Sequence, residues 1–140
     1  MSDFNAFGLP QPVLASLTRI NITEPTLIQK ELIPAAIAGQ DVLASAQTGS
    51  GKTLAYLIPL LKKLYEEPAT NREVSALVLT PTRELAIQVE DTLRQLMPRG
   101  MSCIRLIGGE PMSIQVRKLR ASKTRYPLKV VIATPGRLID

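Results

Sequence analysis

Short apolar runs alternate along this chain with longer segments in which apolar residues recur every three or four positions. Four runs of strand length predict buried β-strands at residues 41–45, 76–80, 104–107 and 130–133. Helical spacing between them predicts three helices, at residues 52–67, between Pro81 and Pro98, and at residues 112–119. Alternating strands and helices predict a parallel sheet with helices on both faces, so the expected fold class is α/β.

The first part of the chain has a different pattern, without a candidate strand. Helical spacing predicts helices at residues 12–19 and 26–38. We therefore expect a helical lead segment at 1–40 and an α/β domain at 41–140. Ligands of parallel sheets bind at the carboxyl ends of the strands. The loops at that edge should be the ones after Ser45, Thr80, Ile107 and Ala133, which carry the sequences AQTGSGKT, PTRELA, GGE and TPGR.

Composition excludes several classes of protein and of site. No apolar run approaches the ~20 residues of a membrane span, and the N-terminus does not resemble a signal peptide, so we expect a soluble, cytoplasmic protein with no membrane contact. The chain has one cysteine, Cys103, and no histidine. An internal disulfide, a Cys/His zinc site and histidine-based catalysis are therefore excluded, and Cys103 is expected to fill a strand position in the core.

Positive charge is concentrated in the last third of the chain. Residues 1–98 carry 8 basic and 10 acidic side chains, whereas residues 99–140 carry 9 basic and 2 acidic ones. This excess has two readings, a solvated helix and loop or a surface for a polyanion such as nucleic acid. The charge alone does not decide between them.

The segment AQTGSGKT, residues 46–53, has the features of a phosphate-binding loop. Gly49 and Gly51 allow a turn whose N–H groups point inward, and the helix that follows adds its positive N-terminal end. Lys52 is expected to reach the β- and γ-phosphates, and the Thr53 hydroxyl to ligate Mg²⁺. Ala46 stands where the usual pattern begins with glycine. The alternative is a flexible turn that is glycine-rich by chance.

With PTRELA at 81–86, GG at 108–109 and TPGR at 134–137, this loop resembles the corresponding elements of the DEAD-box RNA helicases. Alanine at the head of the loop is that family's usual form. The upstream segments FNAFGL and EPTLIQ resemble its adenine-reading Q motif. The resemblance covers residues 4–139 in order and implies the first RecA-like domain of a phosphate-loop ATPase that uses ATP and Mg²⁺.

Within the Q motif the resemblance implies that Gln29 hydrogen-bonds adenine, that Phe4 packs near the base and that Thr26 ties the segment to the phosphate loop. Ile22 stands where the family usually has an aromatic side chain, and Asn21 where glycine is common. Without the resemblance, Gln29 would be read as a solvent-facing helix residue.

The residues expected to act follow from these matches. Lys52 and Thr53 are the catalytic candidates, and Thr53 the metal ligand. The nucleotide site is expected to comprise Phe4, Ile22, Thr26, Gln29, Ala46, Gln47, Thr48, Gly49, Ser50, Gly51, Lys52 and Thr53. The resemblance implies RNA-backbone contacts, independent of base sequence, from Pro81, Thr82, Arg83, Gly108, Gly109, Thr134, Pro135, Gly136 and Arg137. For Arg83 and Arg137 the alternative role is packing at a helix end or an ion pair, for instance with Glu84 or Asp140.

No DEAD sequence occurs in these 140 residues. We therefore expect the N-terminal part of a longer enzyme that unwinds short RNA duplexes with a second RecA-like domain. Alone, the chain should hydrolyse ATP negligibly and should expose a sheet edge. Two other functions stay open: another phosphate-loop ATPase such as a DNA translocase, and a non-catalytic RNA- or nucleotide-binding module.

Overall fold

A computed structural model describes residues 3–68, 73–97, 99–121 and 127–140. The chain folds as two compact units, Met1–Glu66 and Glu67–Asp140. Each unit has its own core and is treated by itself below. The boundary expected after residue 40, which was placed where candidate strands begin, differs from this division and stays a prediction.

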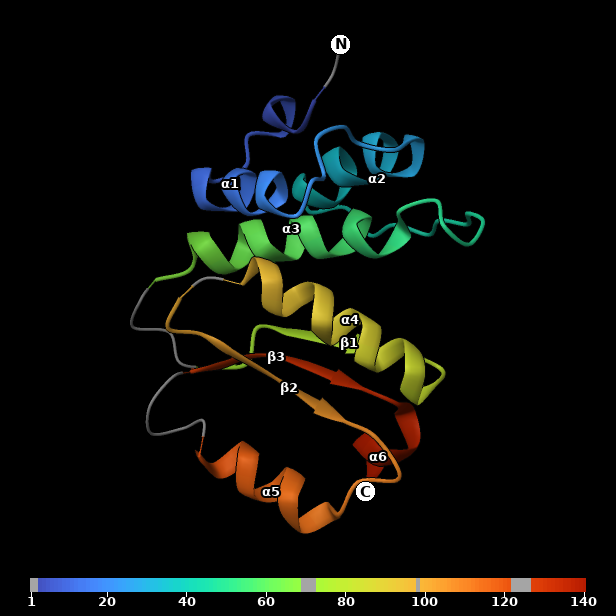
Figure 1. The fold of residues 1–140 in the computed structure, drawn as a ribbon, viewed down its shortest axis with the longest axis vertical. Coiled ribbons are helices and arrows are strands. Elements are labelled where there is room, and N and C mark those ends of the chain that lie inside the picture. The colour runs from blue at the N-terminus through green and yellow to red at the C-terminus, as the bar shows by residue number, and fades with distance from the viewer. Residues whose placement is uncertain (1–2, 69–72, 98, 122–126) are drawn as a thin grey trace. The chain divides into compact units, whose positions relative to one another are not determined.

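The first unit is helical in its described part (Figure 1). Its elements are a short 3-10 helix η1 (Phe4–Phe7) and the α-helices α1 (Gln11–Arg19), α2 (Leu27–Ile37) and α3 (Lys52–Glu66). Both α1 and α2 pack on α3. The helices at 12–19, 26–38 and 52–67 were predicted within a residue at either end, whereas η1 was not predicted.

The core of the first unit consists of apolar residues at helical spacing. Val13 and Leu17 on α1 and Ile33 on α2 are fully or almost fully buried. On α3 the buried apolar positions are Ala55, Leu57, Ile58, Leu61 and Leu64. Burial of these side chains, rather than helix propensity alone, stabilises helices of this length.

The strand predicted at residues 41–45 is wrong. This segment has no regular secondary structure, and its residues are exposed, Leu43 completely so. An apolar run becomes a strand only when a neighbour completes its backbone hydrogen bonds. Within the part of the chain that the structure describes, no strand pairs with these residues.

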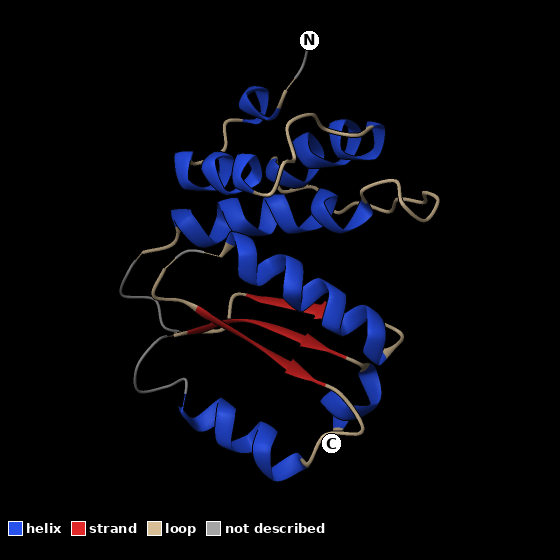
Figure 2. Ribbon diagram, in the orientation of Figure 1, coloured by secondary structure: helices blue, strands red, loops and turns tan. Residues whose placement is uncertain are grey.

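The second unit contains a three-stranded parallel sheet in the order β1-β3-β2 (Figure 2). Its strands are β1 (Ala76–Leu79), β2 (Ser102–Leu106) and β3 (Leu128–Ala133). Its helices are α4 (Arg83–Leu96), α5 (Met112–Ala121) and the short α6 (Pro135–Ile139), of which only α6 was not predicted. In Figure 1, α4 and α5 lie on opposite faces of the sheet. The predicted α/β class, a parallel sheet flanked by helices, is confirmed.

Burial in the second unit is greatest on the central strand. Every residue of β3 is buried, and Ile104, Leu128, Val131 and Ala133 form a cluster with Leu106 and Leu119 packed against it. Cys103 is a buried free thiol on β2, as predicted, and burial raises its pKa. On β1, Leu77 and Leu79 stay half exposed. In the described residues no helix is both long and apolar enough to cross a membrane.

Candidate functional site

All three strands of the second unit end at the same level. In the strand register, Ala133 at the end of β3 pairs with Leu79 on one side and with Leu106 on the other. Two hydrogen bonds continue this register into the loops: Thr80 N donates to Ala133 O at 3.0 Å, and Thr134 N donates to Leu106 O at 3.1 Å. The loops after the three strands therefore leave the sheet together, as the sequence predicted. The loop after Ser45 belongs to the other unit.

The three loops enclose an open cavity of about 740 Å³. Every residue expected to contact RNA lines it except Pro135. Its lining consists of Pro81, Thr82, Arg83, Glu84, Gly108, Gly109, Thr134, Gly136, Arg137 and Asp140. The sequence did not single out Glu84 and Asp140 as parts of a site, although each lies within three residues of a predicted arginine. The structure therefore brings together side chains separated by more than fifty positions in the sequence.

Arg83 lies directly over the two-glycine turn. Its Nη1 donates to Gly108 O at 3.4 Å. Gly109 has a φ of +85°, and a Cβ added there would collide with the guanidinium of Arg83. The positive φ is a backbone conformation that residues with a side chain rarely adopt, and this explains the glycine, whereas the guanidinium is the far end of a flexible side chain that could move aside. In the described residues Arg83 makes no ion pair, so its charge is available to a ligand.

Arg137 approaches the cavity from α6. Its Nε lies 3.9 Å from a carboxylate oxygen of Asp140, and its Nη1 lies 3.7 Å from the sulfur of Met112 at the start of α5. The ion pair considered as the alternative role of Arg137 is thus present. It is long, and Asp140 is mostly exposed, so solvent screens it and the guanidinium keeps donors for an anion.

Thr82 begins α4 at the rim of the cavity. Its backbone is extended, and its Oγ1 accepts a hydrogen bond from Leu85 N at 3.2 Å, which caps the helix. The positive N-terminal end of α4 consequently faces the same loops as Arg83. An anion in the cavity would be stabilised by both.

The phosphate-loop candidate lies in the first unit and has the expected backbone. Gly49 and Gly51 have φ values of +82° and +87°, and Ser50 N donates to Gln47 O at 3.2 Å. Helix α3 then starts at Lys52, whose side chain is exposed. Among the described residues, the N–H groups of Gly51, Lys52 and Thr53 have no acceptor within the chain, and the buried Ser50 Oγ has no partner either. Free donors at a helix N-terminus fit an anionic phosphate.

Gln29 is buried, with 2% of its surface exposed, so its reading as a solvent-facing helix residue is wrong. Its Oε1 accepts from Thr26 N at 2.9 Å, as part of a capping box at the start of α2. Its Nε2 donates to Gly51 O at 3.1 Å. The amide therefore joins α2 to the phosphate-loop candidate, a role that the resemblance assigned to Thr26.

Thr26 also lies close to the loop, because a Cβ at Gly51 would come within 2.8 Å of its Oγ1. Beside α2 and the loop is a cavity of about 340 Å³, lined by Thr26, Leu27, Ile28, Glu31, Ser45, Ala46 and Ser50. Phe4 is buried with its ring 6.0 Å from that of Phe7, and Ile22 is partly exposed. Neither side chain lines this cavity. The adenine contacts of Gln29, Phe4 and Ile22 stay predictions.

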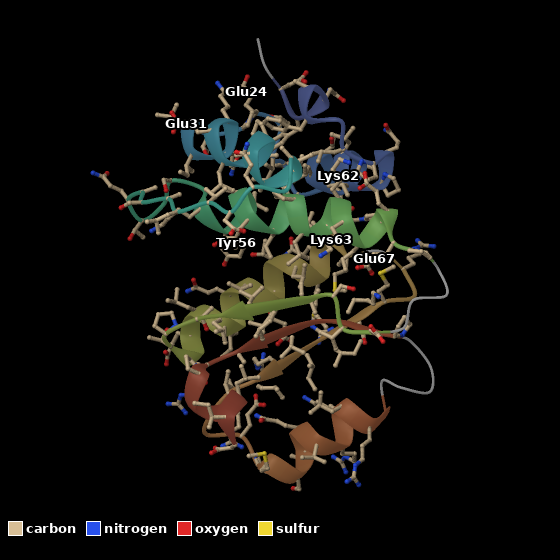
Figure 3. The ribbon with its side chains drawn as sticks, turned by 180° about the vertical axis from the view of Figure 1, so that it is seen from behind. Glu24, Glu31, Tyr56, Lys62, Lys63 and Glu67 are labelled. Atoms are coloured by element: carbon tan, nitrogen blue, oxygen red, sulfur yellow. The ribbon has the colours of Figure 1, made fainter. Side chains whose placement is uncertain are left out.

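Thr53 lies in the first turn of α3, three residues before Tyr56, which is labelled in Figure 3. Burial raises the pKa of the Tyr56 phenol, and a hydrogen bond with Thr53 acts in the opposite direction. The Thr53 hydroxyl still has a lone pair for a metal. In the described ranges, no cluster of three or more His, Cys, Asp or Glu residues could hold an ion. A Mg²⁺ ion at Thr53 would thus take most of its oxygens from phosphate and water, as this ion commonly does.

A polar network on α4, β2 and α5 was not expected from the sequence. Gln115, 1% exposed, donates through Nε2 to Ile107 O at 2.8 Å and to Glu110 Oε2 at 3.2 Å. Arg105 Nη2 donates to Glu110 Oε1 at 2.8 Å, and Arg105 Nη1 donates to Glu90 Oε2 at 3.2 Å. These polar residues alternate with apolar ones, so only the folded arrangement shows that they meet.

Comparison with known proteins gives a consistent result. Residues 26–140 match the family model described as DEAD/DEAH box helicase. The protein named probable ATP-dependent RNA helicase DDX59, from Mus musculus, is 45% identical over 141 residues, which cover 99% of this chain and 21% of that protein. This chain thus spans about a fifth of the length of that relative.

Solved structures agree in fold. The RNA helicase Prp28 from Chaetomium thermophilum bound to ADP has a TM-score of 0.86 and 39% identity, over 100% of this chain and 34% of that one. The DEAD-box helicase Mss116 bound to single-stranded RNA and UDP-BeF has a TM-score of 0.86 and 31% identity, over 98% of this chain and 28% of that one.

Proposed function

The chain belongs to the DEAD/DEAH box helicase family, and on this premise we propose that it binds a nucleotide and an RNA strand for an ATP-dependent RNA helicase. Family membership gives the class of protein. Because the chain spans only about a fifth of a named relative, the activity of the whole protein is part of the proposal. That activity would be the separation of short RNA duplexes with a second RecA-like domain.

The observation that carries the RNA part is the cavity formed by the three strand-end loops. It offers the Arg83 and Arg137 guanidinium groups, the Thr82 and Thr134 hydroxyls and glycine backbone without side chains. This set suits phosphate and sugar oxygens, including the 2′-OH. It offers no aromatic platform for a base. Binding is therefore expected to be independent of base sequence.

For the nucleotide, we propose binding at residues 46–53. The free N–H groups of Gly51, Lys52 and Thr53 would hold phosphate oxygens, and the exposed Lys52 would add a positive charge. Thr53 would ligate Mg²⁺, which supplies charge neutralisation at the transferred phosphoryl group. Gln29 would fix the loop through Gly51 O while its segment contacts adenine.

The test is the binding of a short oligouridine to Arg83→Ala, followed by fluorescence anisotropy over a range of salt concentrations. The affinity should fall by about tenfold, and the slope of log K against log salt should become shallower by about one unit, because one phosphate contact is lost. Arg99→Ala, which removes the same charge from an exposed position before β2, should change neither by a comparable amount. A loss seen only with one RNA sequence, or an equal loss in both variants, would contradict backbone recognition in this cavity.

A further inference from the structure

The Gly108–Gly109 turn of the cavity is held by hydrogen bonds from Gln115, a side chain with no assigned role. Gln115 lies on α5, and its amide nitrogen donates both to Ile107 O and to Glu110 Oε2. Ile107 is the residue immediately before Gly108, and Glu110 is the residue immediately after Gly109. One amide group therefore joins the two ends of the turn.

The amide orientation is determined by its surroundings. Both neighbours of Nε2 are acceptors, a carbonyl and a carboxylate, so the oxygen cannot occupy that place. In the described part of the chain the other amide atom, Oε1, is buried without a hydrogen-bond partner. An unpaired buried oxygen costs free energy. An apolar side chain of similar size would avoid this cost, so packing alone does not account for glutamine here.

The second half of the arrangement anchors Glu110. Its Oε1 accepts from Arg105 on β2, and Arg105 in turn donates to Glu90 on α4, which also pairs with Arg94 at 2.9 Å. The hydrogen bond from Arg105 holds the pKa of Glu110 below its ordinary value. The turn is thus connected to elements on both faces of the sheet, while Arg83 covers it from the cavity side.

We propose that Gln115 and Glu110 are positioning residues that hold the Gly108–Gly109 turn in the conformation that accepts the RNA backbone. This inference rests on the proposed function of the cavity. Glycine is intrinsically free to adopt many backbone conformations, and Gly109 has a φ of +85°, so a turn that contains two glycines needs external restraint. The amide of Gln115 supplies the restraint on one side, and Arg83 supplies it on the other.

The main test is Gln115→Leu in the 140-residue chain, with oligouridine affinity and its salt dependence as readouts. The affinity should fall by about tenfold, as expected for loss of a hydrogen-bonded restraint, while the salt slope stays that of the wild type because no phosphate contact is removed. Leu96→Ala, a core truncation at the far end of α4, controls for lost stability, and Gln88→Leu, at an exposed position, controls for the substitution. Wild-type affinity in Gln115→Leu, or an equal loss in Leu96→Ala, overturns the proposal.

A second pair of variants, at the partly exposed Glu110, separates an effect on the position of the turn from an effect of the charge of the carboxylate. Removing a carboxylate beside a polyanion site should by charge alone tighten binding. We expect Glu110→Ala to weaken it instead, by about threefold, since the anchor is lost, and Glu110→Gln, which keeps one of the two acceptor oxygens, to weaken it less. Tighter binding in Glu110→Ala overturns the proposal.

A structural readout keeps this inference distinct from the RNA assignment. If the wild-type chain does not bind oligouridine, the proposed function fails. Whether Gln115 holds the turn is then tested by the amide resonances of Gly108 and Gly109 in ¹⁵N spectra. These should shift and broaden in Gln115→Leu and stay in place in Gln88→Leu. Unchanged glycine resonances in Gln115→Leu would show that the turn does not need the amide.

Discussion

At Gly51 the start of α2 approaches the phosphate-loop candidate closely. Its φ is +87°, and a Cβ at this position would lie 2.5 Å from Gln29 Nε2 and 2.8 Å from Thr26 Oγ1. The glycine therefore serves two purposes, the turn of the phosphate-loop candidate and the close approach of α2. Its carbonyl oxygen accepts the hydrogen bond from Gln29.

We predict that Gly51→Ala weakens nucleotide binding and lowers the free energy of unfolding by about 2 kcal/mol or more, because strain at positive φ adds to displacement of the Gln29 amide. Calorimetric titration with Mg-ADP and chemical denaturation measure the two effects. The matched control is Gly39→Ala, since Gly39 has a φ of +83° but open space around it. Equal destabilisation in both variants would mean that the contact with α2 contributes nothing.

The contacts of individual side chains were the hardest feature to predict from the sequence. Gly49 and Gly51 were identified correctly as turn positions, because the conformational freedom of glycine is a local property. Asn21, which stands where the family commonly has glycine, has a φ of +62°, and asparagine is among the side chains that tolerate this conformation best. The roles of Gln29 and Gln115 depend on carbonyl groups of other elements, and no local pattern indicates which carbonyl an amide will meet.

Helices were predicted well where the sequence marks both of their ends, for instance with a capping residue or a proline. Helix α4 begins at a threonine cap and carries four buried apolar residues at helical spacing, Ala86, Val89, Leu93 and Leu96. In contrast, residues 41–45 had the composition of a strand and did not become one. Whether an apolar run forms a strand is decided by its partners, which lie elsewhere in the sequence.

The network that links α4, β2 and α5 should make the free energy of unfolding depend on pH in the acidic range. Glu110 has a pKa below its ordinary value of 4.5, chiefly because Arg105 donates a hydrogen bond to it. A depressed pKa means that the ionised form stabilises the fold at neutral pH, and that this contribution is lost as the pH falls below about 4.5 towards the lower folded value.

We therefore predict that Glu110→Gln reduces the drop in the free energy of unfolding between about pH 6 and pH 3, since the variant has no carboxyl group to protonate at this position. Urea denaturation at several pH values measures this drop. Glu24→Gln, at an exposed position of the first unit, is the control. An identical pH dependence in Glu110→Gln and in the wild type would show that the Arg105 contact does not stabilise the folded chain.

For the whole molecule, the order of motifs was more informative than any one of them. The resemblance to DEAD-box helicases, stated from the sequence, agrees with the family model over residues 26–140. The convergence of PTRELA, GG and TPGR was also expected, because the ends of adjacent parallel strands meet at one edge of a sheet. The sequence could not show what restrains the turn between them, since that depends on side-chain packing in three dimensions.

The most direct test of RNA binding in this cavity is to map oligouridine binding on the amide resonances of the ¹⁵N-labelled chain. If RNA binds in the cavity, the following amides should shift together and saturate at one RNA concentration: Thr82, Arg83, Gly108, Gly109, Gly136 and Arg137. Shifts confined to the exposed basic residues of α5, Arg117, Lys118 and Arg120, with the three strand-end loops unchanged, would contradict it.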